Sequence, residues 1–170
     1  MLVSKNNDLK LVRNLMHIGV TTCPADMPVL EAARLLYTQD IESLIVLDEN
    51  GHSAGVFGKK EAAQIYAQTA GNGAGLQTLT VADAMRADIL EVPPDIPAPA
   101  AAQIMLDQAR REIHLLHHAG GIGWPAAVFR FEDILRYLAA ETEADVAALG
   151  VGAPRKSAIE LFRERYAKKT

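Results

Sequence analysis

An internal repeat constrains the fold of this chain more than any other feature. Eight residues of the first half recur in the same order in the second half, each 69 positions later. The pairs are Val12 and Val81, Met16 and Met85, Pro24 and Pro93, Asp26 and Asp95, Pro28 and Pro97, Ala32 and Ala101, Ala33 and Ala102, and Gln39 and Gln108. Such self-similarity indicates a duplicated structural unit.

The repeat continues, at a wider spacing, through a short apolar strand that leads into a charged helix start. Residues 54–62 (AGVFGKKEA) correspond to residues 126–134 (AAVFRFEDI), 72 positions later. The second copy therefore carries three additional residues, and the glycine-rich loop 120–125 is the natural place for them. We expect this loop to lengthen a turn without changing the order of the elements.

Each copy has the pattern of a short strand, a helix, two strands joined by a turn, and a second helix. In the first copy, apolar residues recur at helical spacing from Val29 to Tyr37. Residues 43–47 (SLIVL) form the continuous apolar run of a strand covered on both faces, and Asn50-Gly51 favours a tight turn. The pattern predicts an α/β (α+β) fold of two pseudo-symmetric β-α-β-β-α repeats.

The repeats divide the chain into a first copy at 10–69, a glycine-rich linker at 70–79 and a second copy at 80–149. A phosphate-binding glycine loop would follow a strand and open a helix, whereas this glycine-rich segment follows a helix, so it is interpreted as a linker. An apolar stripe that includes Leu135 and Leu138 continues to Gly150 and predicts one long last helix. Residues 151–170 predict a separate, basic C-terminal helix.

The composition excludes several classes of protein. A formal net charge of -4 argues against a general nucleic-acid binder. Cys23 is the single cysteine, so an intrachain disulfide is impossible, and its apolar surroundings predict a buried, inert thiol. No run approaches the roughly 20 apolar residues of a membrane span, and the N-terminus lacks a signal core. We therefore expect a soluble, cytoplasmic protein.

Three histidines, His114, His117 and His118, invite a metal interpretation. On a strand His114 and His118 share one face while His117 points away, and no carboxylate or cysteine is spaced to complete a site. We therefore predict no metal site. No nucleophile and base can be paired in the sequence either, so no catalytic residue is assigned and no enzyme activity is expected.

The repeat as a whole resembles a cystathionine-β-synthase (CBS) domain pair, also called a Bateman module. The resemblance covers about residues 10–140 and rests on Met16, the helix start 29–33 (VLEAA), the strand and turn 44–51, and the junction 55–61. It implies two repeats packed through their sheets about a pseudo-twofold axis, and modules that pair into flat dimers. It also implies two clefts that bind adenosine ligands and thereby regulate an attached or partner protein.

The resemblance also assigns candidate ligand-binding residues. In ligand-binding relatives the strand-to-helix junction carries a Ser or Thr and, three residues later, an Asp whose carboxylate accepts hydrogen bonds from ribose. Here these positions hold Arg130 with Asp133, and Gly58 with Glu61. A guanidinium can still bind phosphate in a bidentate manner. The first cleft would combine Arg130 and Asp133 with Met16, Val20, Thr21, Ile41 and Glu42. The second, weaker cleft would combine Gly58 and Glu61 with Met85, Ile89, Leu90 and Arg111.

The resulting hypothesis is a stand-alone, homodimeric regulatory module that requires no cofactor. It would bind an adenine nucleotide, with AMP, ADP and ATP ranked before NAD and S-adenosylmethionine, and modulate an unknown partner protein. Asp133 could instead serve only as a helix cap. The alternative function is then a ligand-free dimerisation or protein-interaction module with degenerate clefts, which docks through the C-terminal helix.

Overall fold

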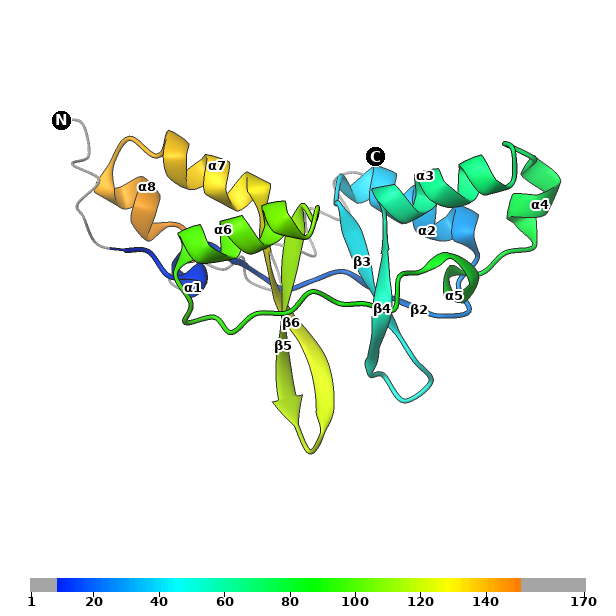
Figure 1. Cartoon of the computed structure of the whole chain (residues 1–170), viewed down its shortest axis with the longest axis horizontal. Helices are drawn as coiled ribbons and strands as arrows, with labels where there is room; N and C mark the ends of the chain where they lie inside the picture. The colour runs from blue at the N-terminus through cyan, green and yellow to red at the C-terminus, as the bar shows by residue number, and fades with distance from the viewer. Residues whose placement is uncertain (1–8, 151–170) are drawn as a thin grey trace, which may run out of the picture.

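The computed structural model describes residues 9–150 and shows two similar halves side by side (Figure 1). The first half of the chain contributes α1 (Val12–Leu15), β1 (His17–Ile18), β2 (Thr22–Pro24), α2 (Val29–Gln39), β3 (Ser43–Leu47), β4 (Ser53–Gly58) and α3 (Lys59–Gln68). The second half contributes α4 (Gly73–Gln77), α5 (Val81–Ala84), α6 (Ala98–Asp107), β5 (Glu112–Ala119), β6 (Ile122–Arg130), α7 (Phe131–Ala139) and α8 (Glu143–Ala147). The C-terminal helix predicted for 151–170 lies outside the described residues.

Two three-stranded sheets form in this part of the chain, one for each half. One sheet has the order β2-β3-β4, in which β2 and β3 are parallel and β3 and β4 form an antiparallel hairpin. The other has the order β1-β6-β5, in which β5 and β6 form the equivalent hairpin. The α/β fold class and the pair of repeats predicted from the sequence are confirmed.

The first strand of each repeat pairs with the sheet of the other repeat. His17 in β1 lies opposite Val128 in β6, and its counterpart Arg86, 69 residues later, lies opposite Val56 in β4. Two backbone hydrogen bonds, of 2.8 and 2.9 Å, join Arg86 and Val56. This reciprocal exchange follows the repeat spacing and gives the module its pseudo-twofold relation.

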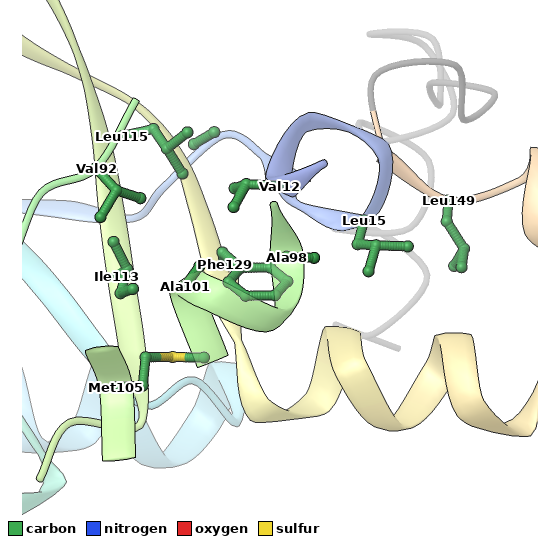
Figure 2. Packing of buried hydrophobic residues seen from close by; sticks show 11 residues of the cluster. Val12, Leu15, Val92, Ala98, Ala101, Met105, Ile113, Leu115, Phe129 and Leu149 are labelled. Carbon is green, nitrogen blue, oxygen red and sulfur yellow. The ribbon is translucent and has the colours of Figure 1, made fainter. Parts of the chain in front are cut away.

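The hydrophobic core is divided into two clusters, and each includes a short helix from the other half. Val12 and Leu15 of α1 pack with Ala101, Met105 and Phe129 of the second repeat (Figure 2). Conversely, Val81 of α5, a helix of the second half, packs in the hydrophobic cluster of the first repeat, which contains Phe57. The helices α1 and α5 are thus exchanged together with the strands that follow them.

Two local predictions differ from the structure. The last helix of the second repeat is not continuous, because α7 ends at Ala139 and Thr142 starts α8 by accepting a hydrogen bond from the backbone N–H of Asp145. The glycine-rich linker is also not entirely irregular. It contains the short helix α4, which Asn72 caps through its side-chain oxygen.

Candidate functional site

Two clefts and a smaller cavity between them lie where the two repeats meet. The first, cleft A, has a volume of about 410 Å³. It is lined by His17, Ile18, Gly19, Val20, Thr21, Ile41, Glu42, Ser43, Ile45, Glu112, His114, Val128 and Arg130. Most of its walls come from β1, the segment that follows β1, and the start of β3.

The second, cleft B, has a volume of about 380 Å³. It is lined by Glu42, Ser43, Val56, Gly58, Lys59, Lys60, Glu61, Arg86, Ala109, Arg110, Arg111 and Glu112. The smaller cavity, about 290 Å³, shares Glu42 and Arg130 with cleft A, and Glu42, Lys59 and Arg111 with cleft B. The three spaces therefore adjoin one another along the junction of the repeats.

Cleft A brings together five of the seven residues that the resemblance assigned to it. These are Val20, Thr21, Ile41, Glu42 and Arg130. Met16 is not among the lining residues, because its side chain packs against the hydrophobic cluster of the second repeat, which contains Phe129. Asp133 is fully buried beneath the lining, at 0% exposure.

Cleft B contains three of its six assigned residues, Gly58, Glu61 and Arg111. Met85 packs against the core cluster of the first repeat and Leu90 against that of the second. Ile89 does not line any of the three cavities described here. The apolar wall expected from this segment is therefore missing from cleft B.

The buried Asp133 carboxylate is occupied by neighbouring donors. Its Oδ2 accepts hydrogen bonds from the backbone N–H of Arg130 at 2.9 Å and from Arg130 Nε at 3.3 Å. Its Oδ1 lies 3.3 Å from Arg130 Nη2 and 3.5 Å from Arg136 Nη1. Burial alone would lower the pKa of Arg130, but the hydrogen bond and charge of Asp133 outweigh it, so this pKa is raised. Asp133 is both a helix cap and the anchor of Arg130.

Glu61, the equivalent acid of cleft B, is also occupied, but by an arginine from the other repeat. Its Oε2 accepts the backbone N–H of Gly58 at 3.0 Å, and its Oε1 lies 2.5 Å from Arg86 Nη1. The glutamate side chain is 5% exposed and that of Arg86 22% exposed. Sequence reasoning missed Arg86, because its counterpart in the first copy is His17, which carries no permanent charge.

Gly58 occupies a position that has no room for a side chain. A Cβ atom at this residue would lie 2.7 Å from the backbone oxygen of Glu42 and 2.9 Å from Ser43 Cβ. Packing therefore explains the missing hydroxyl at this junction, which the sequence comparison could interpret only as a departure from the family pattern.

A polar cluster that the sequence analysis did not identify lies between the two clefts. Ser43 Oγ donates a hydrogen bond to Glu112 Oε1, and these two residues are equivalent positions of the two repeats, 69 residues apart. His114 Nε2 lies 3.4 Å from the same glutamate oxygen. Burial raises the pKa of Glu112. Burial and the charge of Arg86 lower the pKa of His114 to about 4, so His114 is neutral at pH 7 and does not form an ion pair with Glu112.

Acidification is expected to destabilise the fold through His114. Its pKa falls from 6.5 to about 4 on folding, so its contribution is complete above pH 6.5 and is lost as the pH falls towards 4. The loss amounts to about 3 kcal/mol at most. Glu112 opposes it, because its raised pKa lets the folded state bind more protons above pH 4.5.

The measurement is the free energy of unfolding by denaturant between pH 4 and 7. His114→Gln is expected to flatten the pH dependence, whereas His117→Gln, at an exposed position of the same strand, is expected to leave it unchanged. Identical slopes for the wild type and His114→Gln would contradict the prediction.

The remaining predicted features concern single residues. Cys23 is 2% exposed, and burial raises the pKa of its thiol to about 11, which confirms an inert thiol. His118 Nε2 pairs with Glu91 at 2.5 Å. Within residues 9–150, no group of three or more His, Cys, Asp or Glu side chains is arranged to hold a metal ion. In the same range no helix is both long and apolar enough to cross a bilayer.

Comparisons with known proteins agree with this architecture. The family model of the CBS domain matches residues 12–67. A CBS-domain-containing protein of Agrobacterium tumefaciens has a similar structure, with a TM-score of 0.65, 20% identity, and 78% of this chain and 96% of that chain covered. No sequence among the curated proteins matches the chain.

Two further similar structures hold ligands. The CBS domain pair of protein MJ0100, in complex with 5′-methylthioadenosine and S-adenosyl-L-methionine, has a TM-score of 0.65 and 20% identity, with 77% and 97% of the two chains covered. The protein CBSX2, in complex with AMP, has a TM-score of 0.60 and 19% identity, with 75% and 95% covered. Residues 12–67 therefore match the CBS domain model, and the described residues have the fold of a tandem CBS domain pair.

Proposed function

We propose that this chain is a regulatory, non-catalytic module that binds an adenine nucleotide in cleft A and passes its ligand state to a partner protein. The observation that carries the proposal is the division of cleft A into an apolar wall and a cationic end. The wall consists of Ile18, Val20, Ile41, Ile45 and Val128, and the cation is Arg130. Ligand sites are typically apolar cavities of this size with a few orienting polar groups.

The apolar wall supplies a surface on which a purine can pack, and Arg130 supplies a guanidinium for a phosphate. The adenosine ligands of the similar structures MJ0100 and CBSX2 support an adenine compound as the ligand. AMP, ADP and ATP are the first candidates, with NAD and S-adenosylmethionine after them.

Arg130 connects ligand binding to the state of Asp133. In the structure its guanidinium lies on the Asp133 carboxylate at 3.3 Å. A phosphate that attracts the guanidinium would free oxygens of Asp133, which could then accept hydrogen bonds from ribose hydroxyls. In one ligand, the phosphate would thus replace Asp133 as the partner of Arg130, and the ribose would replace Arg130 as the partner of Asp133.

A ligand can regulate the module only if it binds two conformations unequally. The relative tilt of the two repeats is the variable that fits cleft A, because its walls come from both repeats. The proposed output is a change in a partner protein, through a module that we propose is a homodimer in the cytoplasm.

The proposal is tested by calorimetry with AMP, ADP, ATP, NAD and S-adenosylmethionine. Val20→Trp is expected to fill cleft A and abolish binding, because Val20 lines the cleft without belonging to either buried cluster. The matched control is Ile89→Trp, since Ile89 is the equivalent position of the other repeat and lines none of the described cavities. No binding of any of these ligands to the wild type at millimolar concentration would refute the proposal.

A ligand-free interaction module is the second candidate. The observation that favours it is that both junction acids, Asp133 and Glu61, are already paired with arginines. In this case all five titrations fail, and deletion of residues 151–170 abolishes partner capture while the fold remains intact. Unchanged capture by the truncated protein would contradict docking through that segment.

A further inference from the structure

Cleft B differs from cleft A in the side chains that line it. Five lysines and arginines line cleft B against three glutamates, whereas cleft A has one arginine against two glutamates. The apolar side chains of cleft B are only Val56 and Ala109. We propose that cleft B is a polyphosphate site, which binds a chain of phosphate groups and does not recognise a ribose or a base.

Four of the five cations of cleft B fall into a fixed pair and an available pair, and the fifth, Lys59, lies 3.6 Å from Asp40 Oδ1 and 3.9 Å from Glu42 Oε2. Arg86 is held by Glu61, and Arg110 Nη2 is held by Asp88 at 2.8 Å. Each of these two arginines is compensated by its carboxylate, and their side chains are only 22% and 15% exposed, so they serve as fixed donors at the wall of the cleft. Partly buried charges are screened by salt less than exposed ones.

The available pair consists of Lys60 and Arg111. Lys60 is exposed, and unlike its neighbour Lys59 it forms no ion pair with the described residues. The Arg111 side chain is 73% exposed, and its nearest carboxylate oxygen, on Glu42, is 3.9 Å away. Both side chains can therefore turn their donors to an anion, and a guanidinium can contact phosphate oxygens in pairs.

The same contacts argue against recognition of a nucleoside in cleft B. A ribose diol needs free acceptor oxygens, and those of Glu61 are engaged by the Gly58 N–H and by Arg86 Nη1. The Arg86 contact, at 2.5 Å, is shorter than the 3.3 Å contact between Arg130 and Asp133 in cleft A, so a phosphate would release Glu61 less readily than Asp133. A base needs an apolar surface, and cleft B lacks the aliphatic wall of cleft A. The positively charged side chains of cleft B are therefore the groups that would recognise a ligand there.

A polyphosphate in cleft B could come from two sources. It could be a free inorganic chain, or it could be the phosphate tail of a nucleotide whose adenosine occupies cleft A. The second source is geometrically open because Glu42, Ser43 and Glu112 line both clefts. The chemistry at cleft B is the same in both cases.

The test is calorimetry of the full chain with tripolyphosphate, ATP, AMP and adenosine, in magnesium-free buffer of low ionic strength. The informative variant is Lys60→Ala/Arg111→Ala, which changes exposed side chains outside both core clusters. Arg34→Ala, an exposed arginine of α2 outside all three cavities, is the matched control. The double variant is expected to weaken tripolyphosphate binding by about tenfold or more, and the control to leave it unchanged.

The four ligands distinguish an inorganic polyphosphate from the tail of a nucleotide, and they distinguish the polyphosphate site of cleft B from the nucleotide site proposed for cleft A. If tripolyphosphate alone does not bind, but the double variant weakens ATP by about tenfold and spares AMP, the tail of a nucleotide is the occupant. If the double variant alters the affinity of neither tripolyphosphate nor ATP, or if neither binds the wild type, the polyphosphate site is overturned. Adenosine reports on cleft A alone, so its failure counts against the proposed nucleotide function and not against cleft B.

Discussion

Phe129→Ala is expected to lower the free energy of unfolding by about 3–5 kcal/mol. Phe129 lies at 0% exposure in the hydrophobic cluster of the second repeat, where helices from both halves of the chain meet around it (Figure 2). Removing the ring leaves a cavity among side chains that are fixed by the β5–β6 hairpin and by α1 and α6, so the site cannot collapse to fill it. Equilibrium unfolding in denaturant, followed by circular dichroism, measures the change.

Phe57→Ala is the matched comparison, because Phe57 is the equivalent residue of the first repeat and is also at 0% exposure. A similar loss is expected for both variants. Since α1 and α5 are exchanged between the clusters, each variant should still unfold in one transition with both repeats lost together. A loss below about 1 kcal/mol for Phe129→Ala, or a separate transition for one repeat, would contradict this description of the core.

Asp133→Ala is expected to cost about 3 kcal/mol, the second large effect. The substitution removes the acceptor of the Arg130 backbone N–H and leaves a partly buried guanidinium without its main partner. Glu132, at 3.4 Å from Arg130 Nη1, retains part of the electrostatic compensation. The measurement is again the free energy of unfolding, at neutral pH.

The control for Asp133→Ala is Asp83→Ala, which removes an acid at the same position of another helix. Asp83 caps α5 by accepting the Thr80 N–H at 2.8 Å, but it is exposed. Its loss removes a cap without leaving a buried charge, so a much smaller effect is expected. Equal losses for the two variants would show that burial of Asp133 contributes nothing beyond capping.

The architecture could be predicted because the repeat distributes the signal over many positions. Pairs such as Val12 and Val81 mark equivalent places in two units, so one mistaken strand or helix does not change the result. Local patterns were less reliable. Tyr37 continues the apolar spacing of α2 but is 87% exposed, and the stripe through Leu135 and Leu138 belongs to a helix that ends at Ala139. Periodicity records where apolar residues recur, and it does not record what covers them.

The clefts could be predicted only in part. Val20, Ile41 and Arg130, which the resemblance assigned to one cleft, do line one cavity, because the backbone of a known fold fixes these positions. The pairing of Glu61 with Arg86 could not be predicted, since it is a contact between side chains from different repeats. Comparison of the two copies does not predict the ion pair either, because the position equivalent to Arg86 in the first copy is His17, and the pair therefore has no counterpart at the other junction.

The position of Glu112 could have been identified from the repeat spacing. It is equivalent to Ser43, and a pseudo-twofold relation brings equivalent residues into contact only close to its axis. The hydrogen bond between Ser43 and Glu112 therefore marks the axis between the clefts. The partly buried Glu112 lies on this axis, which explains why it lines both clefts.

The exchange of α1 and α5 between the two cores gives a physical reason for the duplication itself. The second copy alone would lack α1, which supplies Val12 and Leu15 to its cluster, and it would leave the apolar surface beneath that helix in water. One copy is therefore half of a folding unit, and two separate chains could complete each other only by meeting in solution, as in a domain-swapped dimer. Joining them in one gene replaces that encounter with a high effective concentration, so assembly no longer depends on how much protein the cell makes.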